Sequence, residues 1–322
     1  MKNSASKKER CYTGRDVAFL IPTKDRHEKV KKLLNSLANQ TVLCGRVIVV
    51  DGGKSVQDVV MSFSDTLPVE YYECRPPGQI RQRNEGLSFI DNRTPLVGFL
   101  DDDIVLEPKA LESMISFWNR CDPDTAGVSF NIINIAPERR SWLECFLGIS
   151  APQPGRVLRC GMTTSVTNVL SDVRTQYLCG GATVWRWQIL KKFPQDEIDY
   201  RWAIGEDVLF SYPIGKRYPL YVCAVATVLH EHEMDYVSRH KYRFHGYSQT
   251  IWLFYIVKSN EEFSTPLLLW SLFVRIVSNC AIGILTLNVS QLDFSVGQIK
   301  GTIKGLKTLI SRKDMKMIFH EE

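Results

Sequence analysis

The first hundred residues alternate continuous apolar runs with segments of helical spacing, and this pattern constrains the fold more than any other feature. Four apolar runs are predicted strands, at 16–22, 46–52, 69–74 and 96–100. Apolar residues recur at helical intervals in the three segments between them, 29–39, 56–63 and 79–90. Continuous apolar strands are typical of a sheet that is covered on both faces. The chain is therefore expected to form an α/β fold with a mainly parallel sheet flanked by helices.

Length, charge and cysteine content exclude several other classes of protein. The chain has 322 residues, long enough to bury a core without a metal ion or disulfide bonds. Its net charge of +5 is mild, so we expect no nucleic-acid partner. The 9 cysteines include no Cys-x-x-Cys pair, which favours a reducing compartment. Residues 1–15 are polar and lack the apolar core of a signal peptide, so a cytoplasmic location is expected.

Polar and acidic side chains follow three of the predicted strands. They lie in the segments 22–26, 51–53 and 101–103. In open α/β sheets, ligands bind at the carboxyl ends of the strands, so these segments are expected to form one site. Each of the first two segments also has a structural interpretation, because Thr23 is a suitable helix cap and Asp51 precedes two turn-forming glycines.

The triple aspartate 101–103 is the strongest of these signals. Adjacent carboxylates repel one another, which costs stability unless a cation offsets the charge. In an extended segment Asp101 and Asp103 would face one ligand together, and Asp102 would face away. Carboxylate oxygens suit Mg²⁺ or Mn²⁺, which bind through one or two carboxylates plus substrate phosphates. The alternative interpretation is a solvated acidic turn.

Seven segments in this order resemble family-two glycosyltransferases, which have the Rossmann-like GT-A fold. The first four are Pro22-Thr23, Val50-Asp51-Gly52, Gln82-Arg83-Asn84 and Phe99-Leu-Asp-Asp-Asp103. The last three are Cys179-Gly-Gly-Ala-Thr-Val-Trp-Arg186, Gly205-Glu-Asp207 and Ala226-Thr-Val-Leu-His230. The resemblance covers about residues 16 to 245. It implies a nucleotide-diphospho-sugar donor, a divalent metal and transfer to an acceptor hydroxyl with inversion, although the sequence alone does not exclude retention.

The resemblance also implies roles for individual residues. Thr23 and Asp51 would hold the nucleobase and ribose, and either Arg81 or Arg83 would lie beside the nucleotide. An alternative role for Arg83 and Asn84 is to tie neighbouring strands together. The metal ligands would be Asp101, Asp103 and His230; His232 also follows the last strand. The implied donor-site residues are Pro22, Thr23, Arg26, Asp51, Arg81, Arg83, Asp101 and Asp102.

Acceptor-side residues are implied in the second half. Gly180, Gly181 and Ala182 match the family's acceptor segment, and Asp207 matches its catalytic base. An acceptor hydroxyl must lose a proton as it attacks, and a nearby carboxylate is a suitable general base. Glu206 is the neighbouring candidate. The structural interpretation of both carboxylates is that they stabilise the start of a helix.

The C-terminal third is apolar and then basic. The stretch from Leu267 to Val289 is long enough to cross a bilayer, but Arg275 stands at its middle. Lysines and arginines downstream favour attraction to an anionic membrane surface. We expect peripheral contact through residues 251–316 at the inner face of the membrane. The alternatives are a single span and an ordinary helical subdomain.

These observations predict one GT-A catalytic domain over 16–245, with a nucleotide-sugar half at 16–125 and an acceptor half at 126–245. A helical extension at 246–322 follows it. The expected function is assembly of a cell-surface polysaccharide or lipid-linked glycan. Two alternatives are a sugar-phosphate nucleotidyltransferase, which would carry a glycine-rich loop after the first strand, and a catalytically silent, membrane-associated binding subunit. The donor sugar, the linkage and the oligomeric state are not predicted.

Overall fold

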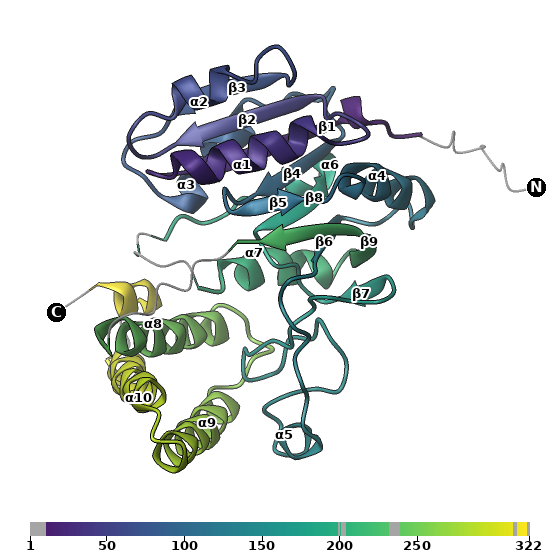
Figure 1. The fold of residues 1–322 in the computed structure, drawn as a ribbon. Helices are drawn as coiled ribbons and strands as arrows, with labels where there is room; N and C mark the ends of the chain where they lie inside the picture. Colours follow the sequence, from purple (N-terminus) through teal and green to yellow (C-terminus); the bar gives the residue numbers. More distant parts are fainter. Residues whose placement is uncertain (1–10, 199, 201–203, 232–238, 312–313, 321–322) are drawn as a thin grey trace, which may run out of the picture.

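The computed structural model describes residues 11–198, 200, 204–231, 239–311 and 314–320. Its first half contains four parallel strands, β1 (Val17–Thr23), β2 (Arg46–Asp51), β3 (Val69–Glu73) and β4 (Leu96–Leu100). The helices that join them are α1 (His27–Ala38), α2 (Gln57–Met61) and α3 (Gln79–Ser88). Every strand and helix predicted over these residues is present within two residues of its expected limits (Figure 1). The α/β prediction is confirmed.

The second half extends the same sheet with mixed directions. Its strands are β5 (Ile104–Leu106), β6 (Gly127–Ile132), β7 (Val173–Thr175), β8 (Ala182–Arg186) and β9 (Leu220–His230). The order across the sheet is β3-β2-β1-β4-β8-β6-β9-β5, with β7 paired to β9. β8 is antiparallel to both β4 and β6. The helices here are α4 (Ala110–Arg120), α5 (Trp142–Phe146), α6 (Trp187–Leu190) and α7 (Glu206–Gly215).

The core lies on both faces of the central strands. All seven residues of β1 are buried; Phe19 and Ile21 pack into one hydrophobic cluster, and Ala18 and Leu20 pack into the other. Burial on both faces explains why these strands are continuous apolar runs. The parallel register also places Thr23 opposite Asp51, which brings two of the predicted site segments to one edge of the sheet.

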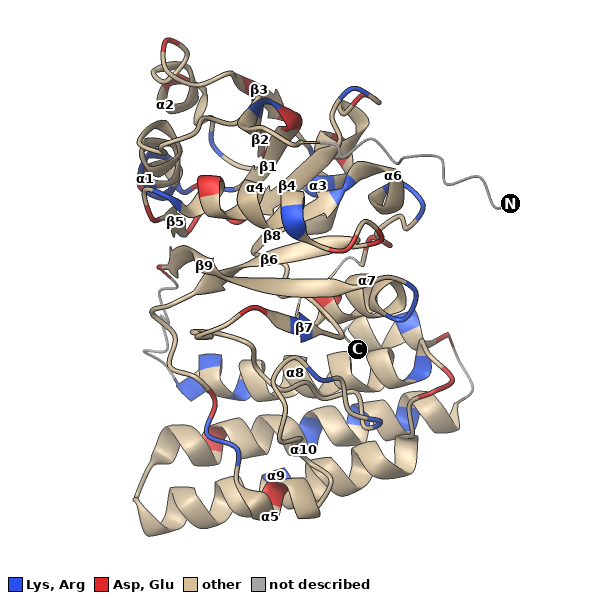
Figure 2. Cartoon of the chain, turned by 90° about the vertical axis from the view of Figure 1, so that its right-hand side faces the viewer, with Lys and Arg blue, Asp and Glu red and all other residues tan. Residues whose placement is uncertain are grey.

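The C-terminal residues form three long helices, α8 (Arg239–Lys258), α9 (Thr265–Leu285) and α10 (Val289–Ile310), beyond α7 and β9 (Figures 1 and 2). α8 and α10 pack so closely that a Cβ at Gly297 would lie 2.0 Å from the carbonyl oxygen of Arg243. α8 runs across the predicted boundary at 245, so its first residues belong to the same helix as the extension. The proposed domain limits otherwise stay a prediction.

The apolar stretch from Leu267 to Val289 contains most of one helix and the first residue of the next. α9 ends at Leu285, Leu287 has a positive φ of 52°, and Asn288 caps α10 through a hydrogen bond from the backbone of Gln291. The chain therefore reverses within the stretch. Among the described residues, α9 is the one helix long and apolar enough to cross a membrane by length and composition.

Candidate active site

The three adjacent aspartates do not alternate as an extended segment would. β4 ends at Leu100, and the backbone N–H of Ile104 donates to the carbonyl of Asp101 at 3.1 Å, which closes a turn. Asp102 therefore points into the site: it accepts hydrogen bonds from Thr23 Oγ1 and Arg26 Nη1, both at 2.7 Å. The expectation that Asp101 and Asp103 face one ligand while Asp102 faces away is wrong in this respect, because a turn does not preserve the alternation of a strand.

Asp103 and His230 form the second part of the cluster. His230 Nε2 lies 3.1 Å from Asp103 Oδ1, and the pairing of β5 with β9 brings them together by placing Ile104 opposite His230. Burial lowers the pKa of His230, but the hydrogen bond with Asp103 and the negative charges of Asp103 and Asp101 together outweigh it and raise the pKa overall. Burial likewise opposes ionisation of Asp103, yet His230, Arg26 and Lys29 hold its pKa below the ordinary value. His232 lies outside the described residues.

The chemistry of this pair fits a divalent metal. A carboxylate oxygen and an imidazole nitrogen in contact are two ligands that Mn²⁺ accepts, and a nucleotide diphosphate supplies further oxygens. Within the described ranges no group of three or more His, Cys, Asp or Glu side chains is arranged to hold a metal. Asp101 in particular is turned toward other partners, so Asp103 and His230 would be the principal protein ligands.

Thr23 and Asp51 occupy the neighbouring strand ends, and both are buried. Asp51 accepts hydrogen bonds from the backbone of Gly53 at 2.7 Å and of Val56 at 3.1 Å, and from Tyr71 Oη at 2.9 Å. Both of its oxygens thus hold the loop that follows β2. In this structure Asp51 shapes the donor edge of the sheet, and its predicted contact with the nucleotide stays a prediction.

The two arginines of α3 have different surroundings. Arg83 is 1% exposed; its Nη2 donates to Asp101 Oδ1 at 2.8 Å, and its Nη1 lies 4.0 Å from Glu206. Arg81 lies at the surface and pairs with Glu197 at 2.9 Å. Arg83 is therefore the arginine within the site. Burial and direct contact with two carboxylates distinguish it, and neither can be inferred from spacing alone.

Two glutamines of α3 take part in the site without a predicted role: Gln82 belongs to the quoted segment 82–84, and Gln79 lies outside it. Gln82 Nε2 donates to the carbonyls of Thr23 at 2.8 Å and Val50 at 2.7 Å, so it is Gln82 that ties β1 to β2. Gln79 Nε2 donates to Asp101 Oδ1 at 3.0 Å. Their position in the first turns of the helix that follows β3 was the available signal. They fix the orientation of the strand ends and of Asp101.

The predicted acceptor segment lies against the donor-side cluster. A Cβ at Gly181 would lie 2.7 Å from Asp101 Oδ2, and one at Gly180 would lie 3.3 Å from Arg83 Nη1. Ala182 begins β8 and is buried. Because they lack a side chain, Gly180 and Gly181 allow the backbone just before β8 to approach Arg83 and Asp101 closely. The first and second halves of the sheet therefore meet at the site.

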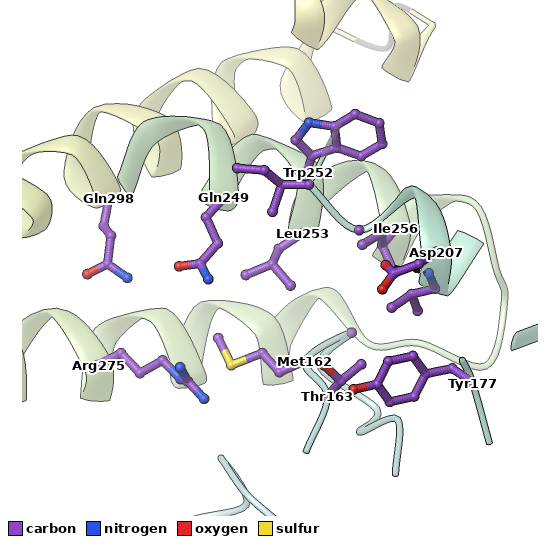
Figure 3. Close-up of a pocket in the computed structure, with 14 residues that line it drawn as sticks. Met162, Thr163, Tyr177, Asp207, Gln249, Trp252, Leu253, Ile256, Arg275 and Gln298 are labelled. Atoms are coloured by element: carbon purple, nitrogen blue, oxygen red, sulfur yellow. Dashed lines mark hydrogen bonds between the residues drawn. The ribbon is translucent and has the colours of Figure 1, made fainter. Parts of the chain in front are cut away.

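Glu206 and Asp207 begin α7, after Gly205 with a φ of +96°. They line different cavities. Asp207 lines one of about 260 Å³, the Asp207 cavity, together with Tyr177 and residues of α8, α9 and α10 (Figure 3). Glu206 lines another of about 210 Å³. The expected helix-start role is also present, since Asp207 Oδ1 accepts from the backbone of Val208 at 2.8 Å.

Both carboxyl groups are less acidic than usual. Burial raises the pKa of Glu206 to about 8, with the charge of Asp207 adding to the effect. Burial also raises the pKa of Asp207 to about 6, but hydrogen bonds from the backbone and the charge of Arg83 limit the rise. Of the two groups, Asp207 therefore gives up its proton more readily than Glu206. A buried, ionised carboxylate facing a cavity can accept a proton from a bound hydroxyl.

Comparisons with known proteins identify the family and the fold of the chain. The sequence model described as "Glycosyl transferase family 2" matches residues 18–191. The minor teichoic acid biosynthesis protein GgaA of Bacillus subtilis (strain 168) is 24% identical over 178 residues, which are 52% of this chain and 36% of that protein. The chain thus spans about a third of that relative's length.

Two solved structures share the fold over most of both chains. A Pyrobaculum calidifontis mannosyltransferase, PcManGT, in complex with GDP-Man and Mn²⁺, has a TM-score of 0.53 at 13% identity and covers 89% of this chain and 87% of its own. S. aureus TarS 1–349 has a TM-score of 0.51 at 14% identity and covers 92% of each chain. A longer TarS structure, with a TM-score of 0.50 at 14% identity, is covered over 43% of its length and 83% of this chain. The family match covers more than half of this chain and includes its acidic strand ends, and the chain is thus a glycosyltransferase of family two with the GT-A fold.

Proposed function

We propose that the protein transfers a sugar from a nucleotide-diphospho-sugar to a hydroxyl of a glycan acceptor, with inversion and with a divalent metal. The observation that carries this proposal is the position of Arg83 between the two parts of the site. Arg83 is buried, its Nη2 lies 2.8 Å from the donor-side Asp101, and its Nη1 lies 4.0 Å from Glu206 at the start of α7. It connects the acidic strand ends with the helix that carries Asp207. Donor chemistry and acceptor chemistry would then take place in one continuous site.

The side chains suit each part of such a reaction. Asp207 would accept the proton of the acceptor hydroxyl as it attacks. Arg26 and Lys29, which surround Asp103, would lie near the diphosphate as its negative charge grows. A divalent ion held at Asp103 and His230 would supply further stabilisation of that charge. Direct attack by the acceptor needs no nucleophile from the protein, and a single displacement inverts the anomeric carbon.

The expected biological context is assembly of a cell-surface polymer on the cytoplasmic side of the membrane. The name of the Bacillus subtilis relative, a minor teichoic acid biosynthesis protein, supports a glycan polymer as acceptor. The Pyrobaculum calidifontis structure, which contains GDP-Man and Mn²⁺, supports a nucleotide-sugar donor with a metal. A lipid-linked glycan acceptor is compatible with the same chemistry.

A donor panel tests this function. We expect one nucleotide-diphospho-sugar, in the presence of Mn²⁺ or Mg²⁺, to raise the melting temperature of the protein, because a ligand that binds only the native state stabilises it. At 100 times Kd the stabilisation amounts to about 2.7 kcal/mol. The panel should include UDP- and GDP-linked sugars, each with metal and with a chelator. If every nucleotide sugar leaves the melting temperature unchanged in the presence of metal, the proposed function is wrong.

An apolar surface shared by α5 and by α9 of the extension supports the proposed membrane contact. α5 lies beside α9 (Figures 1 and 2), and Trp270 Nε1 on α9 donates to the carbonyl of Leu147, just after α5, at 2.9 Å. The side chains of Trp142 and Phe146 on α5 and of Phe273 on α9 are exposed by 78%, 80% and 61%. Exposed aromatic side chains on neighbouring helices are typical of a surface that lies in a membrane interface.

We expect the full-length protein to sediment with anionic phospholipid vesicles and to be released by high salt or alkaline washing. Replacing Phe146 and Phe273 together by serine should reduce the bound fraction at least tenfold, because each buried aromatic side chain contributes about 1.5–3 kcal/mol. Leu170→Ser, at a residue 98% exposed outside α5 and α9, is the matched control. Release by detergent alone would indicate a spanning helix, and failure to bind vesicles would indicate an ordinary subdomain.

A further inference from the structure

The Asp207 cavity has a positive charge at the end opposite its carboxylate. Asp207 lies at one end with Tyr177 and Thr163, and Arg275 of α9 lies at the other with Gln249 and Gln298 (Figure 3). Among the described residues that line this cavity, Asp207 and Arg275 are the two that carry charge. Arg275 is also the only charged residue in α9. The otherwise uncharged sequence of α9 gives no structural reason for an arginine at this position, and the resemblance to family-two enzymes assigns it no role.

Arg275 is incompletely paired within the part of the chain that the structure describes. Its Nε is buried without a hydrogen-bond partner among those residues. Its Nη2 donates to the carbonyl of Ile149 at 3.4 Å, which is long for a hydrogen bond. No ion pair joins it to a described carboxylate. A partly buried guanidinium in this state is costly, because it loses hydration without gaining a counter-charge.

The surroundings of Arg275 are held in place. Gln291 Nε2 donates to Asn279 Oδ1 at 2.8 Å, and Asn279 Nδ2 donates to Gln298 Oε1 at 3.1 Å. This chain of amides fixes Gln298, which is 2% exposed, between α9 and α10. Gln249 on α8 faces the same end of the cavity. An anion beside Arg275 would therefore meet the amide group of Gln298 in a fixed position.

The length of the cavity suits an acceptor. Along α8 the lining runs from Gln249 to Ile256. These two residues are seven positions apart, which is about 10 Å at the helical rise per residue. Ile256 lies at the Asp207 end. A sugar unit whose hydroxyl reaches Asp207 would thus extend toward Arg275. The group that follows this sugar unit in the acceptor would lie beside the guanidinium.

We propose that the Asp207 cavity is the acceptor site and that Arg275 binds a phosphate group of the acceptor next to the sugar unit that is glycosylated. This rests on the proposed function, because it takes Asp207 as the base. A guanidinium donates two parallel hydrogen bonds to phosphate oxygens, and the tetrahedral group has further oxygens for Gln249 and Gln298. A neutral glycan would leave the charge of Arg275 uncompensated. The phosphate belongs either to a soluble phosphodiester polymer or to a lipid phosphate.

Calorimetric binding to the full-length protein tests the site without turnover. The probes are a soluble glycerol-phosphate oligomer, farnesyl phosphate in neutral detergent micelles, an uncharged glycerol oligomer, and a glucuronate oligomer. We expect at least one phosphate probe to bind. Its Kd should rise about 10- to 100-fold in Arg275→Gln, because hydrogen bonds to charged groups have that worth, and less in Arg275→Lys. Lys300→Gln, which removes an exposed charge from α10, should bind as wild type.

A second variant covers the case in which Arg275→Gln does not fold. Gln249→Glu places a carboxylate at the same end of the cavity, and it should block phosphate binding by pairing with Arg275. Binding by the soluble oligomer alone identifies a polymer phosphate as the source, and binding by farnesyl phosphate alone identifies a lipid phosphate. The inference is overturned if no phosphate probe binds, if Arg275→Gln and Gln249→Glu bind as wild type, or if only glucuronate depends on Arg275.

The donor panel separates this inference from the proposed function. Loss of phosphate binding with metal-dependent donor stabilisation intact would overturn the acceptor assignment alone. Phosphate binding through Arg275 without any donor stabilisation would instead overturn the proposed function. Arg275→Gln should leave the donor-induced rise in melting temperature unchanged, because within the described ranges Arg275 makes no hydrogen bond or ion pair with the acidic strand ends and lines the cavity from α9.

Discussion

Asp207→Asn is expected to lower kcat by about 10²–10⁴-fold while the affinity for the donor nucleotide stays near that of the wild type. Asparagine keeps the shape of the side chain and its bond to the backbone of Val208, but a neutral amide cannot accept the acceptor's proton. A base acts on proton removal in the transition state and contributes little to donor binding. The measurements are steady-state kinetics with the acceptor and donor-induced thermal stabilisation.

Two measurements make this assignment specific. Glu206→Gln is the matched control, and we expect a smaller loss, because Glu206 lines a different cavity and its burial disfavours the ionised form that a base requires. Wild-type kcat should also fall as the pH drops through about 6, where Asp207 becomes protonated, and level off above it. Near-normal turnover in Asp207→Asn, or a larger loss in Glu206→Gln, would show that Asp207 is not the base.

The first half of the fold could be predicted because its signals are local. The limits of β4 at Leu96 and Leu100 follow from an apolar run closed by aspartates, and β2 ends where Asp51 meets two glycines. A parallel sheet covered by helices imposes that pattern on each strand separately. The second half is less regular in sequence because β8 inserts between β4 and β6 in the opposite direction, and no local pattern specifies that pairing.

The site was predicted in outline, but its contacts depend on residues far apart in the chain. The turn at Asp101 reorients Asp102 toward Thr23, which lies 79 residues away. The choice of Arg83 over Arg81 depends on burial against Asp101, and the role of Arg275 depends on α8, α9 and α10 enclosing a cavity with Asp207. On sequence alone, Arg275 is an interruption in a candidate membrane span. Because the extension packs against α7, Arg275 instead lines a cavity that it shares with Asp207.

Asp103→Ala is expected to abolish the metal-dependent binding of nucleotide. Of the three aspartates, Asp103 is the one in contact with His230, at 3.1 Å, and it is also surrounded by Arg26 and Lys29. Removing its carboxylate takes away one of two adjacent ligands and leaves three cationic groups facing one another. Adding the donor nucleotide should then change the melting temperature no more with Mn²⁺ than with a chelator, whereas the wild type should be stabilised by the nucleotide when Mn²⁺ is present.

Loss of a buried, paired carboxylate also destabilises the fold, so the metal effect must be separated from a folding defect. Asp103→Asn keeps the volume and the hydrogen-bonding capacity of the side chain but binds metal weakly, and it should show the same loss of metal response. Asp102→Asn is the matched control: Asp102 is equally buried and pairs with Arg26, yet it faces Thr23 rather than His230, so its metal response should persist. If Asp103→Asn retains the Mn²⁺-dependent shift, or if wild-type turnover is unchanged with a chelator present, the divalent ion is not bound at Asp103 and His230. The positive charge of Arg26 and Lys29 would then stabilise the leaving diphosphate without it.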